Sequence, residues 1–320
     1  MLRYVFQRIA AALVTFLVII CVVFFVVKAM PGSIFQPNPR QINPRAIELI
    51  NAKYHLDKSL PEQFLIFISN YIRFDFGASL VVRPGLPVLE VIMERLKVTI
   101  QLNLFSGFFV LPMGMIFGIT MALRKDTLYD HAASTAVVFF ISVPSFVLAA
   151  LLQYFVAFKG GLFPVILSPE ETLTWTKFYS MILPILALSF GGIAGMARML
   201  RAELAETLTS DFMLLAKAKG LTYGQTIWRH ALRNACVPLA TTFLYLFLGI
   251  LGSSIVIENI FSVPGLSRTM IYAIQSNDHP LTMAIVYFYA LIGLFMAILA
   301  DLSYGVVDPR IRMGGRKNEE

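Results

Sequence analysis

The sequence predicts an all-α membrane protein with six transmembrane helices and both termini in the cytoplasm. Of its 320 residues, 58% are hydrophobic and only 14% are charged, whereas soluble domains carry about 25% charged residues. Six uncharged runs are each long enough to cross a bilayer, which takes about 20 apolar residues. Lys and Arg are concentrated on one side of these runs. Lipid is therefore the expected surroundings of much of the chain.

The predicted spans follow the chain in order. They are Ile9–Val27, Val98–Leu123, Ala132–Phe158, Phe178–Ala197, Cys236–Ile257 and Leu281–Ala300. The first run follows two arginines, as a signal peptide does, but its apolar core is too long and no small-residue cleavage site comes after it. We therefore expect it to remain as the first helix. Prolines within several spans fit close packing with tolerated kinks, or helices that bend during transport.

The positive charges give the orientation. With a cytoplasmic N-terminus, the cytoplasmic segments hold 14 Lys and Arg residues, and the two short outer loops hold three. The other nine lie in the long segment 28–97, and long translocated segments largely escape the positive-inside rule. The net charge of +7 is explained by this asymmetry, so we expect no nucleic acid partner.

Four parts are predicted along the chain. Residues 1–29 form the N-terminal start and first span, 30–97 an extracytoplasmic segment, 98–307 a five-helix core with a cytoplasmic hairpin at 210–235, and 308–320 a cytoplasmic tail. Within the outer segment, Gln63–Ile72 is apolar but too short to span. The pattern of Pro87–Lys97 predicts a helix lying on the membrane surface.

Motifs of catalysis and cofactor binding are missing from the sequence. It contains no phosphate-binding loop of the Walker type, no zinc-protease motif and no nucleophile elbow. The four histidines are scattered, and Cys21 and Cys236 have no metal-ligand spacing. We expect no enzyme, no cofactor and no metal site. Two acidic residues at span ends, Glu258 and Asp301, fit structural pairing better than a proton relay.

The segment between the fourth and fifth spans predicts a helical hairpin. Ser210 is a plausible N-cap for a short helix over Asp211–Lys219, and Gly220 suits the left-handed position after it. Thr222 and Gln225 have the spacing of a capping box, which predicts a second helix running to Asn234.

The two helices of this hairpin differ in their patterns. In the second, Tyr223, Ile227, Trp228, Ala231 and Leu232 fall on one half of the helix. The first carries apolar residues all round, so we expect it to be covered on most sides. It packs either under its own bundle or in the groove of a partner protein, and its residues alone do not decide between these.

At this hairpin the chain resembles the permeases of bacterial peptide ABC importers, specifically the oligopeptide and dipeptide permease B type. The stretch Asp211–Pro238 is similar to that family's "EAA" loop, which docks on the ATPase subunit. Leu214 stands where the general importer motif has an acidic residue, and the gap from Gly220 to the proline is longer, as in peptide-type permeases. Other similar stretches, in order, are Met1–Tyr4, Pro31–Gly32, Leu56–Asp57, Ser142–Phe146, Phe261–Leu266 and Asp308–Arg312.

The resemblance implies a type I ABC importer permease fold in the bacterial cytoplasmic membrane. The chain would pair with a second, homologous permease, bind two ATPase subunits and receive substrate from an extracytoplasmic binding protein. Oligopeptides are the favoured cargo, while related permeases carry dipeptides, glutathione, nickel complexes or haem. Docking on the ATPase would involve Asp211, Phe212, Leu215, Ala216, Ala218, Lys219, Gly220, His230 and Arg233.

Two other functions are disfavoured by the residues. A stand-alone secondary transporter or channel would need buried coupling charges or a ring of selectivity residues, and the predicted spans offer neither. A membrane-embedded enzyme would need paired catalytic residues, which the sequence lacks. For a permease, polar and small residues of the middle spans are candidates for the substrate path. They are Ser142, Pro144, Ser145, Gln153, Ser189 and Gly192. The same residues would also serve helix packing.

Overall fold

The structure is a computed structural model, and it describes residues 2–29, 55, 57–252 and 254–307. Every regular element among these residues is a helix, and one isolated antiparallel bridge joins Ala78 to Pro87. The described residues form two packing units. The first draws on Met1–Lys97 and Leu266–Ile298, and the second on Val98–Gly265 and Leu299–Glu320. The boundaries of these packing units differ from those of the four predicted parts of the chain. The four parts describe membrane topology and remain a prediction.

Aromatic side chains form the core of the first unit. Its helices are α1 (Leu2–Ala29), α3 (Leu60–Ile72), the start of α4 (Val88–Leu123), α13 (Leu266–Gln275) and most of α14 (His279–Val307). The ring of Tyr71 on α3 lies 4.0 Å from that of Phe67 and 5.2 Å from that of Tyr287 on α14, centroid to centroid. Phe24 of α1 lies 5.1 Å from Phe67. Helix α3 is thus fixed against both α1 and α14.

The N-terminus of α3 is held by a local hydrogen-bonding pair. The carboxylate of Glu62 accepts hydrogen bonds from the hydroxyl of Ser59 at 3.0 Å and from its backbone N–H at 3.1 Å. These bonds lower the pKa of Glu62, because they favour its charged form. The helix therefore begins at a defined residue, which fixes the positions of the side chains along it.

A buried carboxylate ties the loop before α4 to the start of α14. Asp278 is fully buried, and its Oδ2 accepts a hydrogen bond from the Ser79 hydroxyl at 2.6 Å. The same oxygen accepts from three successive backbone N–H groups, those of Leu80, Val81 and Val82, at 3.1, 3.0 and 3.0 Å. Three adjacent N–H groups around one oxygen form an anion-binding nest, which explains why a charge is tolerated there.

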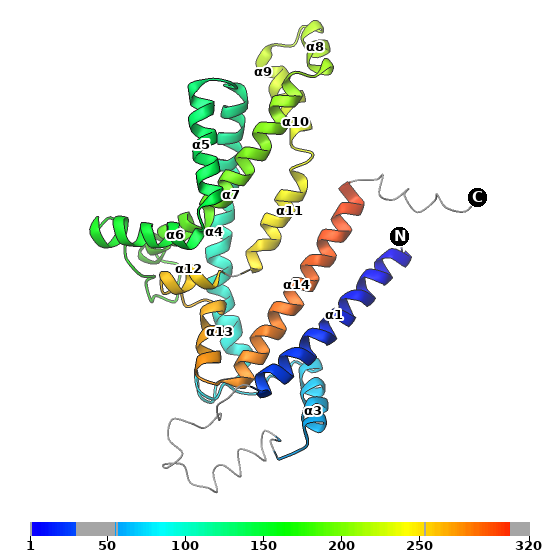
Figure 1. The fold of residues 1–320 in the computed structure, drawn as a ribbon, viewed down its shortest axis with the longest axis vertical. Coiled ribbons are helices and arrows are strands. Elements are labelled where there is room, and N and C mark those ends of the chain that lie inside the picture. The colour runs from blue at the N-terminus through cyan, green and yellow to red at the C-terminus, as the bar shows by residue number, and fades with distance from the viewer. Residues whose placement is uncertain (1, 30–54, 56, 253, 308–320) are drawn as a thin grey trace, which may run out of the picture. The chain divides into compact units, whose positions relative to one another are not determined.

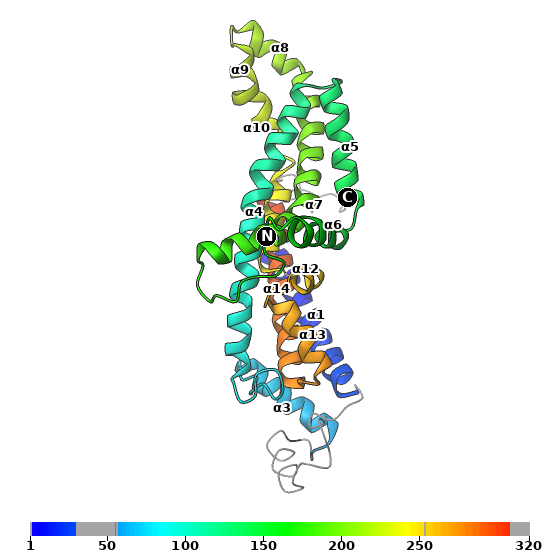
Figure 2. The same ribbon diagram turned by 90° about the vertical axis from the view of Figure 1, so that its left-hand side faces the viewer.

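Long helices lie side by side in the second unit. Besides the rest of α4 it contains α5 (Leu128–Ser142), α6 (Ser145–Leu151), the π-helix η1 (Leu152–Lys159), α7 (Trp175–Leu208), α11 (Ala240–Leu248), the 3-10 turn η3 (Gly249–Leu251), α12 (Ile255–Ile260) and a hairpin described below. Figures 1 and 2 show α4, α5 and α7 running side by side. Arg201 of α7 donates to the buried Asp130 of α5 from Nε at 2.6 Å and from a terminal nitrogen at 2.5 Å. This bidentate pair joins the two helices.

Four described helices are long and apolar enough to cross a membrane. Their apolar stretches, Phe6–Ala29, Val88–Leu123, Trp175–Leu208 and His279–Ala300, contain the predicted first, second, fourth and sixth spans. Six complete spans therefore remain a prediction, and the third and fifth predicted spans differ from continuous helices.

The third predicted span is bent. Helices Leu128–Ser142 and Ser145–Lys159 meet at 102°. The break follows from Pro144, which has no N–H to donate and disfavours the helical conformation in the residue before it. Val143 is accordingly extended, with ψ of 124°.

The fifth predicted span is broken twice. A turn at residues 236–239, which includes Pro238, precedes α11, and the apolar helical stretch Thr242–Leu251 is only ten residues long. Gly252 is extended and ends the helical stretch before α12. Both breaks fall at residue types that disfavour helix interiors.

The prediction of a separate surface helix over Pro87–Lys97 is wrong. Residues from Val88 onward form the first turns of α4, which continues without a break into the predicted second span. Neither Gly nor Pro lies between Val88 and Val98, so nothing ends the helix there. Val91 and Ile92 are buried in the core of the first unit.

Candidate functional site

The predicted hairpin is present and follows the end of α7. Its first helix is α8 (Asp211–Ala218), and its second runs through α9 (Tyr223–Thr226), a π-helical turn η2 (Ile227–Ala231) and α10 (Leu232–Ala235). Gly220 has a φ of +84°, the left-handed conformation predicted for it. Thr222 and Gln225 form the predicted capping box. Ser210 stands at the predicted N-cap, but its hydroxyl donates to the carbonyl of Thr207 and makes no cap hydrogen bond.

One side of the hairpin attaches it to the second unit. Met213 of α8 and Ala231 of η2 are buried in one cluster with Leu200 and Leu204 of α7. Ala216 is also buried, at 6% exposure. Because these residues are fixed by their own chain, the hairpin is a firm extension of α7.

The other side of the hairpin is apolar and uncovered. We define the hairpin patch as the exposed side chains of Phe212, Leu214 and Leu215 on α8 together with Tyr223 and Trp228 on the second helix. Trp228 is 65% exposed and Leu214 64%. This chain covers only the side of α8 that bears Met213 and Ala216, so of the two predicted covers its own unit supplies one side, and cover by a partner protein stays a prediction.

The predicted apolar half of the second helix is only partly buried. Ile227 and Ala231 are buried as expected, but Tyr223 and Trp228 are exposed, and the polar Thr226 is fully buried. The π-helical turn over Ile227–Ala231 departs from the 100° per residue spacing on which the prediction rested, and Trp228 lies within it. Tyr223 and Thr226 precede this turn, in α9. Thr226 satisfies its buried hydroxyl by donating to the carbonyl of Thr222 at 2.9 Å.

Basic residues are also exposed on the hairpin. Lys217, Lys219, Arg229, His230 and Arg233 are exposed, and the Lys217 ammonium lies 5.4 Å from the centre of the Tyr223 ring. Of the nine residues predicted to dock the ATPase, eight are exposed, and Ala216 faces inward. The predicted docking set does not include the exposed Leu214, Tyr223 and Trp228, although large apolar side chains on a short hairpin were a signal that could have pointed to them.

The candidate residues of the substrate path fall in different surroundings. Ser142, Pro144 and Ser145 are exposed at the bend between α5 and α6, and Gly192 is exposed on α7. Ser189 is fully buried, and its hydroxyl lies 2.9 Å from that of Ser106 on α4. These positions leave the predicted path untested, but they identify Ser189 as a helix-packing residue.

The side chain of Gln153 is also held by hydrogen bonds within the chain. Its side-chain amide donates to the carbonyls of Val165 at 3.0 Å and Ile260 at 2.6 Å, so it joins η1 to the end of α12. Both bonds use the amide nitrogen, so a movement of the Gln153 side chain away from these carbonyls would break them.

Glu258 lies buried at the end of the fifth predicted span. Its Oε1 accepts a hydrogen bond from the Thr99 hydroxyl at 2.9 Å, and its carboxylate occupies the space where a side chain at Gly265 would begin. This arrangement fits the structural pairing favoured from the sequence. The side chain of Asp301 lies outside the described residues. Among those that are described, no three His, Cys, Asp or Glu residues come together as a metal site.

Comparison with known proteins gives two family matches. Residues 114–313 match the model for the binding-protein-dependent transport system inner membrane component, and residues 1–103 match the N-terminal model of the same kind of membrane component. Together the two models cover most of the chain.

Curated relatives match along nearly their full length. The chain is 37% identical to the dipeptide transport system permease protein of Bacillus subtilis, covering 98% of this chain and 99% of that protein. It is 34% identical to the corresponding dipeptide permease of Lactococcus lactis and 31% identical to the oligopeptide transport system permease protein of Haemophilus influenzae. Each of these two alignments covers 98% of this chain and 100% of the relative.

Solved structures share the fold. A methionine ABC transporter in an inward-facing conformation matches with a TM-score of 0.52 at 17% identity, over 69% of this chain and 97% of that one. An amino acid ABC transporter solved with histidines matches with a TM-score of 0.50 at 18% identity, over 67% and 92%. At such identities the likeness concerns the fold alone.

Proposed function

The chain belongs to the family of inner membrane components of binding-protein-dependent transport systems, and from this membership we propose that it forms half of the membrane passage of an ATP-driven peptide importer. As a member of that family it is a multi-pass protein of the cytoplasmic membrane and a transport permease, and not an enzyme. Peptides are the proposed cargo because its relatives over the full chain are named as dipeptide and oligopeptide permeases.

The hairpin patch is the observation that carries the coupling role. Five large apolar side chains stand exposed on a hairpin whose opposite side is packed into its own unit. Large apolar side chains exposed together on one short hairpin indicate an interaction site. Basic side chains are exposed on the same hairpin. We assign the patch to a groove of an ATPase subunit.

The remaining partners follow from the type of machine. One permease chain supplies half of a passage, so a second, homologous permease completes it. Two ATPase subunits bind on the hairpin side, and a binding protein delivers peptide from the opposite side. The sequence contains no phosphate-binding loop of its own, which agrees with hydrolysis in separate subunits.

Charged substitutions in the patch test the proposal. Leu214→Glu and Trp228→Glu place charges where the patch would be buried, so ATPase subunits should be lost from purified permease while its amount in the membrane is unchanged. Leu128→Glu is a matched control, because Leu128 is 85% exposed at the start of α5 and outside the hairpin. If both patch variants retain the ATPase subunits and import peptide normally, the docking role is refuted.

A further inference from the structure

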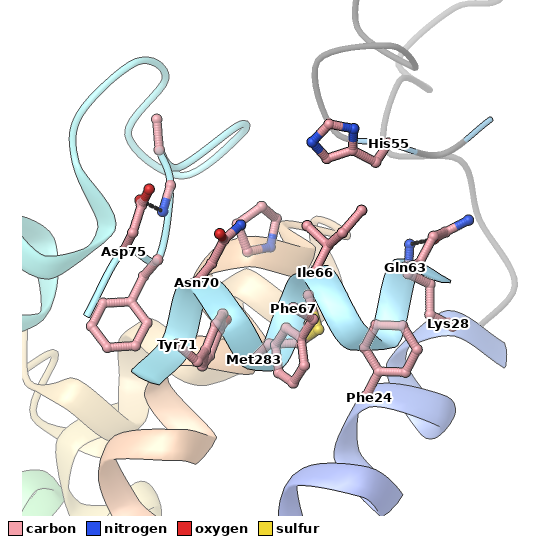
Figure 3. Close-up of a pocket in the computed structure, with 14 residues that line it drawn as sticks. Phe24, Lys28, His55, Gln63, Ile66, Phe67, Asn70, Tyr71, Asp75 and Met283 are labelled. Carbon is pink, nitrogen blue, oxygen red and sulfur yellow. Dashed lines mark hydrogen bonds between the residues drawn. The ribbon is translucent and has the colours of Figure 1, made fainter. Parts of the chain in front are cut away.

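A cavity of about 460 Å³ lies beside α3 in the first unit. This volume is within the range of small-molecule sites in proteins. Figure 3 shows α3 along the cavity, with Lys28 of α1 at one end and Asp75 at the other. Between them the lining includes the apolar side chains of Ile66, Phe67 and Met283 and the amide of Asn70. The cavity therefore combines two opposite charges with an apolar wall.

Each charged group is held in place and keeps bonding capacity. The Lys28 ammonium donates one hydrogen bond to Oε1 of Gln63 at 2.6 Å and lies 5.8 Å from the centre of the Phe24 ring. An ammonium has three donors, so others are available to a ligand. Asp75 accepts the N–H of Gly77 at its Oδ1, at 3.1 Å. A carboxylate has two oxygens with about four acceptor sites, so it too can accept from a ligand.

Helix α3 separates the two charges. Lys28 contacts Gln63, and the backbone N–H of Asp75 donates to the carbonyl of Asn70 at 3.0 Å. Gln63 and Asn70 are two turns apart on one helix, about 10 Å at 1.5 Å per residue, so the two charged residues are anchored at different ends of α3. An extended peptide advances roughly 3.3–3.6 Å per residue, so a ligand that reaches along this part of α3 is a peptide of only a few residues.

The direction of α3 agrees with the charges. Its N-terminal end, where backbone N–H groups give a partial positive charge, lies on the Lys28 side, and its C-terminal end lies on the Asp75 side. A ligand with a negative group near Lys28 and a positive group near Asp75 would therefore be favoured by both the side chains and the helix.

We propose that this cavity binds a short zwitterionic peptide of a few residues, with its carboxylate at Lys28 and its amino group at Asp75. Ile66, Phe67 and Met283 then contact the peptide side chains, which gives tolerance of sequence but selection of short peptides with both ends free. This inference rests on the proposed function, because it places peptide cargo on the permease itself as well as on the binding protein.

Equilibrium binding to the purified complex of both permeases and ATPases, in nanodiscs and without the binding protein, tests the proposal. The probe is radiolabelled Ala-Phe-Ala, compared with its N-acetylated and C-amidated forms and with tri- and penta-alanine. Loss of either end charge should weaken binding at least about tenfold, since a hydrogen bond to a charged group contributes that much. Tri-alanine should bind more tightly than penta-alanine.

Variants assign each peptide end to its residue. Lys28→Gln should weaken binding of Ala-Phe-Ala about tenfold but leave the amidated peptide unaffected, and Asp75→Asn should do the same with the acetylated peptide. Lys58→Gln and Asp57→Asn remove exposed charges of the same segment that do not line the cavity, and should change nothing. Because the modified peptides probe the unaltered protein, the test does not depend on the folding of any variant.

Two results would overturn the inference. One is binding by the complex that is independent of peptide length and of both end charges, and the other is no binding while ATP-driven uptake into vesicles, with the binding protein added, proceeds normally. The second result leaves the proposed import function standing. Failure of uptake for every peptide would instead refute the proposed function, and this inference with it.

Discussion

Replacing Asp278 by Ala is expected to release the loop before α4 from the start of α14. The change removes the acceptor of the Ser79 hydroxyl and of the N–H groups of Leu80, Val81 and Val82. A buried donor left without a partner costs about 1–3 kcal/mol, and hydrogen bonds to charged groups are at the strong end. Water molecules and rotation of the Ser79 hydroxyl replace some of the lost hydrogen bonds. We therefore expect the free energy of local opening of this loop to fall by about 3 kcal/mol.

Amide hydrogen exchange measures this loss where it occurs. Local opening made easier by about 3 kcal/mol should speed exchange at residues 80–82 about a hundredfold. Asp278→Asn, which keeps one oxygen but no charge, should give a smaller increase, and Asp57→Ala, an exposed carboxylate in the same segment, none. If exchange at residues 80–82 in a folded Asp278→Ala permease stays within about threefold of the unaltered protein, the reasoning is refuted.

Three further substitutions have defined outcomes. The Cβ atom introduced by Gly265→Ala would overlap the Glu258 carboxylate. Overpacking of this kind lowers the free energy of unfolding by about 1–3 kcal/mol or more, so less monodisperse permease should be recovered from size-exclusion chromatography. Gly220→Val forces a β-branched residue to positive φ and should reduce ATPase co-purification, whereas Gly220→Asn should retain most of it; equal capture by both would contradict this. Arg201→Met leaves the buried Asp130 carboxylate without its arginine partner and should lower the free energy of unfolding by about 3–5 kcal/mol. This loss should appear as a lower melting temperature in detergent. Adding the second change Asp130→Leu should restore the melting temperature.

Features set by neighbouring residues could be predicted from the sequence. The turn at Gly220 and the capping box of Thr222 and Gln225 depend on residues no more than three apart, and the structure has both. The apolar runs likewise predicted where long helices lie. The residue at which α4 begins was harder to predict, because nothing in the residues before Val98 distinguishes a surface helix from the first turns of α4.

Contacts between distant residues could not be predicted. The nest around Asp278 depends on residues almost 200 positions earlier, and no local pattern marks either partner. The hairpin patch was missed in part for a related reason. Periodicity at 100° per residue assumes a regular helix, and the π-helical turn at Ile227–Ala231 changes which side chains face outward.

The bond between Ser79 and Asp278 also sets an order of assembly during synthesis. The two residues are 199 positions apart, so the loop that carries Ser79 leaves the ribosome long before its acceptor exists. At about 5–20 residues per second, that interval is roughly 10–40 s. Throughout it, three backbone N–H groups must rely on water or on a chaperone. The segment predicted to lie outside the membrane therefore reaches its final form only after the last helix has been inserted.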